Sequence, residues 1–475
     1  MYRYIGGDYL NKIDKFKENI KNKNIAVIGA GISNIPAIIY LKKLGANVCV
    51  LDKNINLLSD KKELQNLNID VSLGDEYLKI LRTEKFDYVL RSPGVKPFTE
   101  ELEIAKANGA IITSEMELFI SLCPCKILAI TGSDGKTTTT TLVYEMLKDA
   151  NKKVFVGGNI GMPLLDKVEE IQKEDIVVLE LSSFQLMTFK DRINVAGVTN
   201  ISPNHLDYHR SYDEYIEAKE NIFKGQTKED VLVLNLDDKI SMKRFKENAK
   251  TEQIRFFSLK ESVENGAYLD GKNVVLSVNG KQQVITTIDK VKLVGMHNIA
   301  NICMAASIVT DFVTLENIKH VAENFTGVKH RMEHIRTVND VKYYNDSIAS
   351  SPTRTIAGLK AFDDKVILIA GGYDKNIPYD EIGSYIVDKV KSLLLIGKTA
   401  PKIKLSVIEE LKRRNLPKDY LEIKDFDNLE DAVLYAKNIA KPFDKVVMSP
   451  ASASFDLYKN FEERGEHFRK IVNAL

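Results

Sequence analysis

The chain has little of what marks secreted, membrane-spanning or nucleic-acid-binding proteins. Its 475 residues include only four cysteines, with no C-x-x-C spacing and no paired framework: Cys49, Cys123, Cys125 and Cys303. This cysteine usage favours a reduced, cytoplasmic compartment. No apolar run approaches the roughly 20 residues that a membrane helix requires. The stretch before Asn24 has charges but no apolar centre, unlike a signal peptide. We therefore expect no membrane insertion.

An excess of charge of one sign is also absent. The 67 Lys and Arg residues balance 66 Asp and Glu residues, and the formal net charge is +1. This balance argues against nucleic acid or an anionic membrane surface as a partner. Apolar content of 44% and charged content of 28% are typical of a globular protein. A chain of this length is too long for one core, so two to four domains are expected.

Short apolar runs alternate with helical patterns in three successive series. The runs that we expect to form strands lie within 24–31, 47–53 and 87–94; within 126–132, 153–161, 175–184, 194–202 and 230–238; and within 341–347, 365–374, 390–397 and 444–452. Such alternation predicts parallel sheets covered by helices. A hairpin is expected in 273–285, because Asn279-Gly280 suits a two-residue turn. We predict an α/β fold of three consecutive domains: 1–113, 114–327 and 328–475.

The segment AITGSDGKTTTT, residues 129–140, joins a predicted buried strand to a predicted helix. Free backbone N–H groups and the helix dipole favour an anion at such a helix N-terminus. Gly132 and Gly135 lack a Cβ, which lets the backbone approach a phosphate closely. Lys136 would neutralise the β/γ-phosphates, and a following threonine hydroxyl would bind Mg²⁺. Ile130 stands where the usual P-loop pattern has a glycine, which makes the loop a shortened variant. A glycine-rich turn with a solvent-exposed lysine is the alternative.

The pattern T-G-[ST]-[DN]-G-K-[TS]-[TS] resembles the ATP loop of the Mur ligases and folylpolyglutamate synthetases, which join a carboxylate to an amine at the expense of ATP. The resemblance extends over nearly the whole chain, from about Asn24 onward. It implies a Rossmann-like first domain for a uridine diphosphate substrate, a central P-loop ATPase-like parallel sheet, and a Rossmann-like third domain for an amino acid. The implied cofactors are ATP and Mg²⁺.

The resemblance also implies roles for individual residues around ATP. The implied cofactor-binding residues are Gly132, Ser133, Asp134, Gly135, Lys136, Thr137, Thr138, Asn298, Asn301, Arg331 and Asp346. The implied metal-binding residues are Thr137, Glu180, His205 and Lys219, the last as a CO₂-derived carbamate. The implied catalytic residues are Lys136, Glu180, His205, Lys219 and Arg331. The arginine would reach the γ-phosphate, where such a group is worth roughly 10³–10⁵ in rate.

Without the resemblance, several of these residues have plainer interpretations. Glu180 ends a predicted strand, where ligands bind in parallel sheets, but it could equally be a surface residue. Lys219 lies between Glu217 and Glu220 on a predicted helix, as a solvated lysine would. Asn298 and Asn301 could equally be helix-cap and surface amides. The H-x₃-H spacings at 205–209 and 330–334 leave a zinc site open, although no third ligand is evident.

The first domain carries a degraded dinucleotide fingerprint. Gly29 and Gly31 fit G-x-G, and Asp52 follows at a strand end, but Asn34 replaces the third glycine. A NAD-dependent dehydrogenase is the alternative that this pattern keeps open. The Mur resemblance instead implies a nucleotide-sugar peptide, with an S-P-G loop that could otherwise be a simple turn. The substrate-binding residues implied in the first two domains are Ser33, Asn34, Asp52, Ser92, Gly94, Asn159, Ser182 and Gln185.

The segment SPASASFDLYKNFEERGEHF, residues 449–468, looks like a strand-end loop followed by a charged surface helix. It resembles a signature of the D-glutamate-adding members of the family. The implied substrates are UDP-N-acetylmuramoyl-L-alanine and D-glutamate, joined through an acyl phosphate in peptidoglycan precursor synthesis. The implied acceptor residues are Ser350, Lys375, Ser454, Phe455 and Phe461. We expect a monomer whose C-terminal domain closes before turnover.

One departure concerns the acceptor. Many relatives continue N-D-S with Lys-Ala-Thr, whereas this chain has Ile348, Ala349 and Ser350. The Ser350 hydroxyl can still bind the acceptor, but the lysine charge is absent. Arg354 could replace that charge if the segment 352–360 turns back toward the site.

Overall fold

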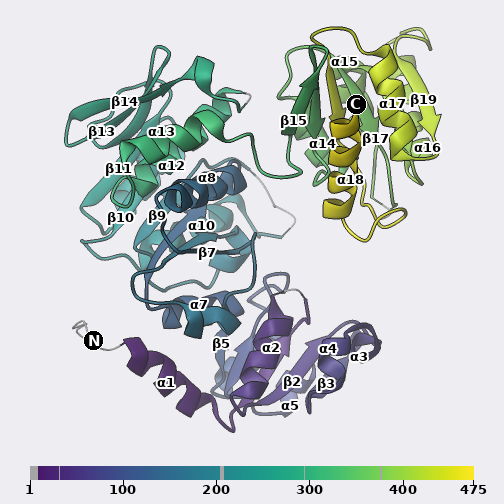
Figure 1. The fold of residues 1–475 in the computed structure, drawn as a ribbon. Helices are drawn as coiled ribbons and strands as arrows, with labels where there is room; N and C mark the ends of the chain where they lie inside the picture. The colour runs from purple at the N-terminus through teal and green to yellow at the C-terminus, as the bar shows by residue number, and fades with distance from the viewer. Residues whose placement is uncertain (1–8, 32, 204–207, 294, 375–376) are drawn as a thin grey trace. The chain divides into compact units, whose positions relative to one another are not determined.

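The computed structural model describes residues 9–31, 33–203, 208–293, 295–374 and 377–475, with side chains from Lys12 onward. It forms two compact units, Met1–Val291 with Met296–Asn324, and Lys292–Gly295 with Phe325–Leu475. The described residues contain three β-sheets, two in the first unit and one in the second (Figure 1). The domain boundaries near residues 113 and 327 stay predictions.

The first sheet has five parallel strands in the order β3-β2-β1-β4-β5. Its strands are β1 (Asn24–Ile28), β2 (Asn47–Asp52), β3 (Asp70–Leu73), β4 (Tyr88–Leu90) and β5 (Ile111–Thr113). Its helices are α1 (Tyr9–Ile20), α2 (Asn34–Lys43), α3 (Leu57–Asp60), α4 (Lys62–Gln65), α5 (Ile80–Thr83) and α6 (Glu100–Ala107). The chain winds outward in opposite directions from β1. The carboxyl ends of β1 and β4 therefore border the crevice where such sheets bind ligands.

The second sheet has nine strands in the order β14-β13-β12-β11-β10-β9-β6-β8-β7. They are β6 (Lys126–Thr131), β7 (Val154–Gly158), β8 (Ile176–Glu180), β9 (Val195–Val198), β10 (Val231–Asn235), β11 (Gln253–Ser258), β12 (Gly266–Asp270), β13 (Asn273–Val278) and β14 (Lys281–Thr287). The strands from β7 to β12 are parallel, and β13 and β14 are antiparallel. Its central strands are buried on both faces, which explains their continuous apolar runs.

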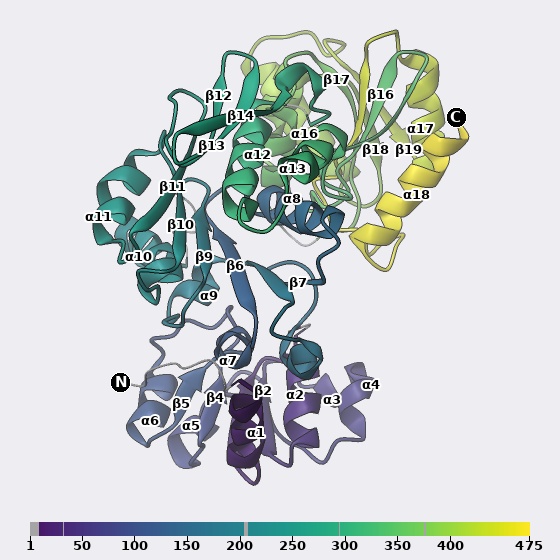
Figure 2. The same cartoon turned by 60° about the vertical axis from the view of Figure 1, so that its left-hand side comes forward.

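Helices cover this sheet (Figure 2). They are α7 (Glu115–Leu122), α8 (Lys136–Asp149), α9 (Ser183–Leu186), α10 (Tyr212–Lys224), α11 (Lys246–Asn248), α12 (Met296–Val309) and α13 (Leu315–Asn324), with a 3₁₀ segment at Leu165–Glu170. The predicted hairpin is confirmed, because Val278 pairs with Lys281 across a turn in which Asn279 and Gly280 have φ of 50° and 75°.

The third sheet has six strands in the order β15-β16-β20-β17-β18-β19. They are β15 (Glu333–Val338), β16 (Val341–Asn345), β17 (Val366–Ala370), β18 (Val390–Ile396), β19 (Glu422–Phe426) and β20 (Lys445–Met448). The helices are α14 (Pro352–Leu359), α15 (Ile382–Lys389), α16 (Ala400–Arg413), α17 (Leu429–Ile439) and α18 (Phe461–Ala474). One apolar cluster lies on each face of the sheet, so helices cover both faces.

Within the first unit, a buried arginine joins the first two sheets. Arg91 follows β4 and is only 2% exposed. Its guanidinium donates to the Val95 carbonyl at 2.7 Å, and across to the Phe184 carbonyl at 3.3 Å. Burial lowers the pKa of Arg91. The Tyr208 hydroxyl donates to the Pro93 carbonyl at 2.8 Å, and its ring lies 4.2 Å from that of Phe184 in α9.

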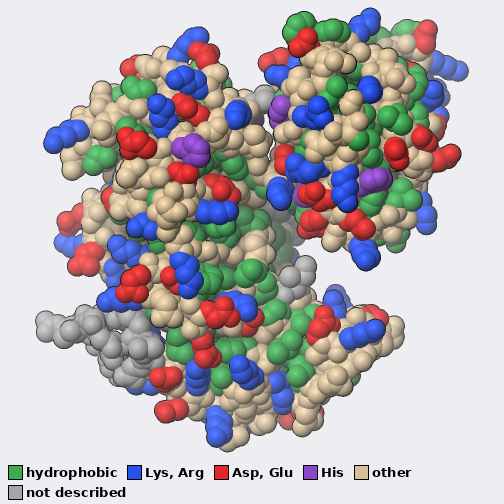
Figure 3. Space-filling model, in the orientation of Figure 1, with side chains coloured by type: hydrophobic (Ala, Val, Ile, Leu, Met, Phe, Trp, Pro, Cys, Tyr) green, Lys and Arg blue, Asp and Glu red, His purple; other side chains and the backbone are tan. Residues whose placement is uncertain are grey.

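The surface of the described residues carries both signs of charge. Figure 3 shows Lys and Arg intermingled with Asp and Glu on the visible face of each unit. In the ranges that the structure covers, no helix has the length and apolar character to cross a membrane.

Candidate functional site

The loop between β6 and α8 is held open by a second loop that follows β9. The Ser133 amide donates to the Asn200 carbonyl at 2.9 Å, and the Asp134 amide donates to the Asn200 side chain at 3.2 Å. The Ser133 hydroxyl contacts the Tyr215 hydroxyl at 2.7 Å. These bonds fix the backbone between Gly132 and the start of α8. The amides at that helix N-terminus have no intrahelical acceptor and suit an anion.

The two loop glycines occupy positions that a side chain could not. Gly132 has φ of 138°, and a Cβ there would lie 1.8 Å from Oγ1 of Thr199. Gly135 caps α8 in the left-handed conformation with φ of 80°. A Cβ there would lie 2.4 Å from Oδ1 of Asn301. Both glycines are therefore required by backbone conformation and by close approach.

Two lysines meet on this loop. Lys136 donates to the carbonyls of Gly132 and Ser133 at 3.0 and 2.8 Å, so its ammonium lies folded over the loop. Lys219 on α10 donates to the same Gly132 carbonyl at 2.6 Å. Thr137 and Thr138 follow in the first turn of α8 and are half-buried. The alternative of a simple turn with a solvent lysine does not fit this arrangement.

Lys219 is not a solvated helix lysine. Its side chain is 2% exposed and its ammonium lies 4.7 Å above the Tyr215 ring. Burial, with a smaller contribution from the Lys136 charge, lowers its pKa well below the ordinary value. A buried lysine with a lowered pKa is a neutral, nucleophilic amine over a wider pH range than a surface lysine.

Glu180 at the end of β8 is also buried, at 1% exposure, which rules out the surface interpretation. One carboxylate oxygen, Oε1, accepts from the Asn159 side chain at 2.7 Å. The other, Oε2, is buried without a hydrogen-bond partner. The negative charge of Glu180 acts to raise the pKa of Lys219, which shows that the two groups lie within electrostatic range of each other.

These donors fit a magnesium ion. Mg²⁺ is usually held by one or two carboxylates together with substrate phosphates and water. Glu180, with its unpartnered Oε2, ends β8 next to β6, the strand that leads into the loop before α8, and Thr137 lies in the first turn of that helix. Among the described residues, no group of three or more His, Cys, Asp or Glu side chains is placed for a metal. This argues against a preformed zinc site in that part of the chain.

The predicted histidine lies outside the described residues, since 204–207 are not among them. Its H-x₃-H partner His209 is buried among aromatic rings, with Nε2 2.9 Å from the Ser183 hydroxyl. On α12, Asn301 is 7% exposed and touches the loop. Its Oδ1 accepts from Thr139 at 3.3 Å and its Nδ2 donates to Asn298 at 3.1 Å. Asn301 therefore lies against the start of α8, with Asn298 bonded to it, and their role in binding a nucleotide stays a prediction.

The crevice of the first sheet brings its predicted residues together. A Cβ on Gly29 would lie 3.4 Å from Cβ of Ser92, so the glycine loop and the S-P-G loop lie side by side. Asn34 is buried and donates to the Gly29 carbonyl at 2.8 Å. Asp52 accepts the Ala30 amide at 2.8 Å. Their polar groups thus support the loop backbone.

The remaining predicted substrate residues of the first unit lie at loop and helix ends. Ser33 and Gly94 are exposed at the crevice. Ser182 and Gln185 form a reciprocal capping box that starts α9 beside Glu180.

In the second unit, Asp346 follows β16 and is fully enclosed. Its Oδ1 accepts the Met332 amide at 3.1 Å and its Oδ2 accepts the Ser449 hydroxyl at 2.6 Å. Burial raises the pKa of Asp346 to about 6, and the charges of Arg331 and Arg354 oppose that rise. Arg331 itself is exposed, between two residues with positive φ. Two cations therefore flank one buried carboxylate.

A buried arginine that the sequence did not reveal organises the acceptor segment. Arg464 on α18 is 1% exposed. Its guanidinium donates to the carbonyls of Ala453, Ser347 and Ser452 at 3.0, 2.9 and 3.1 Å. Burial lowers its pKa to about 10. The residue therefore ties the 449–454 loop to the N-D-S segment. The signal was its helical spacing from the buried residues that follow it.

Four of the five predicted acceptor residues are described in the second unit, and their role stays a prediction. Ser454 is buried, and Phe455 is 58% exposed with its ring 5.9 Å from that of Tyr373. The Phe461 carbonyl accepts the Ser347 hydroxyl at 2.7 Å. Ser350 is half-buried just before α14. The fifth predicted residue, Lys375, lies outside the described residues.

The segment that begins α14 does turn back. Arg354 donates from Nη1 to the Ile348 carbonyl at 3.1 Å. Its exposed guanidinium therefore lies beside Ile348. The role of Arg354 as a replacement charge stays a prediction.

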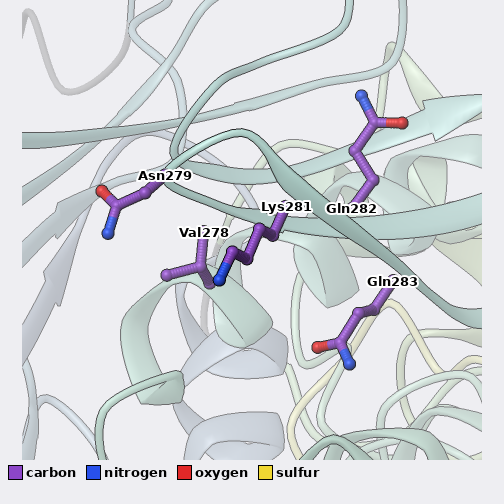
Figure 4. A pocket seen from close by; sticks show the side chains of 5 residues that line it. All are labelled: Val278, Asn279, Lys281, Gln282 and Gln283. Carbon is purple, nitrogen blue, oxygen red and sulfur yellow. The ribbon is translucent and has the colours of Figure 1, made fainter.

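A separate hollow beside the β13–β14 hairpin has a volume of about 570 Å³ (Figure 4). Val278, Asn279, Lys281, Gln282 and Gln283 line it. These residues offer one ammonium group and amides but no carboxylate, thiol or imidazole. The hollow lies at the edge strand, well away along the sheet from β6, and contributes nothing to the site above.

Three family models together match most of the chain. The Mur ligase MurD-like N-terminal domain matches residues 23–114, the Mur ligase middle domain matches 130–309, and the Mur ligase glutamate ligase domain matches 330–452. The chain belongs to the Mur ligase family. The resemblance inferred from the sequence and the predicted three-domain α/β fold are both confirmed.

Relatives and solved structures of the family agree with this assignment. The UDP-N-acetylmuramoylalanine–D-glutamate ligase of Acetivibrio thermocellus is 50% identical over 466 residues, which cover 98% of this chain and 99% of that protein. The enzyme of the same name from Clostridium novyi is 51% identical, with coverage of 97% and 99%. In fold, the chain is similar to the UDP-N-acetylmuramate-alanine ligase MurC of Thermotoga maritima, with a TM-score of 0.55, 18% identity and coverage of 95% and 99%. MurF of Acinetobacter baumannii gives a TM-score of 0.54, 16% identity and coverage of 97% and 92%.

Proposed function

We propose that this protein is an ATP-dependent ligase that adds D-glutamate to UDP-N-acetylmuramoyl-L-alanine. The observation that carries the proposal is the juxtaposition of the loop 131–138 with a buried carboxylate, Glu180, whose Oε2 has no partner. The names of relatives about 50% identical over nearly the full chain supply the substrates. This reaction would be a step in peptidoglycan precursor synthesis.

The reaction requires that a carboxylate become an electrophile. The terminal carboxylate of the nucleotide-linked alanine attacks the γ-phosphorus of ATP, and ADP leaves. The resulting acyl phosphate is attacked by the D-glutamate amine, and the tetrahedral intermediate expels phosphate to leave an amide. The chain contributes positioning and charge neutralisation to these steps.

Lys136 and the loop amides would hold the phosphates. The Lys136 ammonium now donates to the Gly132 and Ser133 carbonyls, and it would exchange those acceptors for phosphate oxygens when ATP binds. Glu180 and the Thr137 hydroxyl would hold Mg²⁺, which neutralises phosphate charge when bound. Asn159 orients the Glu180 carboxylate for that purpose. The family resemblance also assigns Arg331 and Asp346 to nucleotide binding.

The buried amine of Lys219 fits conversion to a carbamate. A neutral amine attacks CO₂, loses one proton and becomes an anionic oxygen ligand. Burial and the Lys136 charge lower the pKa of Lys219 and so favour the neutral amine, and the Lys136 cation would also stabilise the carbamate anion. Lys219→Ala should lose activity and regain part of it with a short-chain carboxylic acid, whereas Lys224→Ala on the exposed side of α10 should retain it. Full activity of Lys219→Ala would contradict this role.

The acceptor would bind in the second unit. D-Glutamate carries two carboxylates, so cations there separate it from neutral amino acids. Arg354 and Lys375 would supply these charges, and Ser350, Ser454, Phe455 and Phe461 would shape the site.

The decisive assay measures phosphate release from ATP with UDP-N-acetylmuramoyl-L-alanine and a panel of D- and L-amino acids. Phosphate release with D-glutamate and with no other amino acid of the panel supports the proposal. Phosphate release with a different amino acid assigns a sister ligase. Nucleotide binding without release would leave only a binding module. A change in NADH absorbance, with no response to ATP, would favour the dehydrogenase. Lys136→Ala should abolish release, and Lys148→Ala at the exposed end of the same helix is the control.

A further inference from the structure

Two of the four cysteine thiols lie side by side at the start of the strand that leads to the ATP loop. Cys123 ends α7 and Cys125 immediately precedes β6. Their Sγ atoms are 3.6 Å apart. All four cysteines are free thiols, in agreement with the absence of a disulfide framework in the sequence, but the closeness of these two sulfurs was not predicted. Cys49 and Cys303 are free, buried thiols elsewhere in the first unit.

The intervening proline holds the two residues in this arrangement. Proline disfavours the helical conformation for the residue before it, and Cys123 has φ of −58° and ψ of 125°. Two residues of extended chain span about 6.6 Å, which lies within the Cα separations of disulfides. A disulfide needs a sulfur separation of about 2.05 Å. The two sulfurs must approach by about 1.5 Å, within the reach of rotation about the Cα–Cβ bonds.

We propose that Cys123 and Cys125 form a redox-active pair that a hydroperoxide oxidises to an intramolecular disulfide and that a small thiol reduces again. The Cys123 thiolate attacks the peroxide oxygen, which gives a sulfenic acid and, after protonation, water or an alcohol. The Cys125 thiol then attacks the sulfenic sulfur. The S–S bond forms and a water molecule leaves. Two thiols are oxidised by two electrons, and one peroxide bond is reduced.

Either sulfur could donate the hydrogen bond that joins the two thiols, and we assign the attack to Cys123. The hydrogen bond between the thiols lowers the pKa of Cys123 and raises the pKa of Cys125. Burial instead raises the pKa of Cys49 to about 11 and that of Cys303 to about 12. Thiolate character governs the first step of oxidation, so the pair should react before the two single thiols.

The burial of the pair selects the oxidant. Cys123 and Cys125 are 6% and 9% exposed. Hydrogen peroxide is small enough to reach such sulfurs, whereas a bulky disulfide is not. A structural zinc site would need four ligands, and the described residues hold no group of three or more His, Cys, Asp or Glu side chains around a common point. Oxidation rather than metal binding is therefore the chemistry that this pair fits.

Peptide mapping of the full-length protein tests the proposal directly. Trypsin cleaves after Lys106 and Lys126, so the peptide 107–126 contains both members of the pair and no other cysteine. After brief treatment with hydrogen peroxide and alkylation under denaturing conditions, that peptide should be about 2 Da lighter than its reduced form and carry no alkyl groups. Dithiothreitol should restore two alkylation sites. The peptides with Cys49 and Cys303 should lose alkylation at least about tenfold more slowly.

Variants separate pairing from simple oxidation. Cys123→Ser should abolish the loss of 2 Da, and Cys125→Ser should leave a sulfenic acid that a dimedone probe captures on Cys123. Cys303→Ser should form the disulfide at the wild-type rate. The proposal is overturned if peptide 107–126 keeps two alkylation sites while Cys49 or Cys303 is oxidised. It is also overturned if that peptide gains only oxygen atoms.

Discussion

Replacing the buried lysine of the candidate site should stabilise the protein while it removes activity. Lys219→Met keeps a similar side-chain volume and removes an amine that is 2% exposed. The variant loses the hydrogen bond to the Gly132 carbonyl, worth about 1–3 kcal/mol. It also removes the cost of deprotonating the lysine on folding, which is about 1.4 kcal/mol for each pH unit below the unfolded pKa until the folded pKa is reached. We expect a net gain of about 2 kcal/mol near neutral pH, or about 4 °C in the midpoint of unfolding.

The pH dependence gives the sharper test. The folded-state pKa of Lys219 is lowered, so the unfolded chain binds a proton that the folded chain does not bind between the two pKa values. The free energy of unfolding of the wild type therefore falls as pH decreases below the unfolded pKa, by up to about 1.4 kcal/mol per unit. The methionine variant lacks this term. Its advantage should grow as pH falls from about 10, and should become constant below the folded pKa.

Differential scanning calorimetry of both proteins between pH 7 and 10, in CO₂-free buffer, measures this difference. Lys224→Met on the same helix replaces an exposed lysine and should change stability by less than about 0.5 kcal/mol. A Lys219→Met variant that unfolds at a lower temperature at every pH, with a difference independent of pH, would refute the reasoning.

Three further predictions concern the glycine, the carboxylate and the arginine described above. Gly135→Ala should weaken binding of an ATP analogue by more than about tenfold in titration calorimetry, since the left-handed conformation alone costs about 1–2 kcal/mol and the new Cβ meets Asn301. Gly109→Ala, with φ of 99° and open space around it, is the control, and equal effects on analogue binding would contradict the steric argument. The pKa of Asp346 is raised to about 6, so the wild type loses stability as this carboxyl ionises. The free energy of unfolding of Asp346→Asn, measured with urea, should therefore rise by about 3 kcal/mol relative to that of the wild type as pH rises from 4 to above 6. A difference that does not change with pH would show that the carboxylate is not held in this way. Arg354→Ala should raise the KM for D-glutamate by about 10- to 100-fold, and adding Ile348→Lys should restore it; an unchanged KM would remove Arg354 from the acceptor site.

The strands that the sequence predicted are those with continuous apolar runs, because double-sided burial in a parallel sheet leaves that signature. β3 and β19 escaped prediction for the opposite reason. Their residues are mostly half-buried or exposed, as expected at sheet edges. The helix α1 was also missed. It precedes the resemblance, and its charged composition gave no reason to expect that it packs on the rest of the unit.

Sequence motifs predicted the loop between β6 and α8 and the residues around it, but the sequence did not show which of these residues are buried. Glu217 and Glu220 made Lys219 look solvated, although α10 turns that side chain under the ATP loop. Arg464 looked like one charge among many in a surface helix. Its role depends on three carbonyls brought together by the fold. Likewise, the spacing of Cys123 and Cys125 in the sequence does not give the distance between their sulfurs, which depends on the conformation of the chain around the proline between them.

The guanidinium of Arg91 has a practical consequence for ligand discovery. A fragment that ends after β5 would remove the α9 acceptor of that cation and expose the guanidinium beside the S-P-G loop. Screening should therefore use a piece that runs at least to Asn324, where the crevice keeps its native wall.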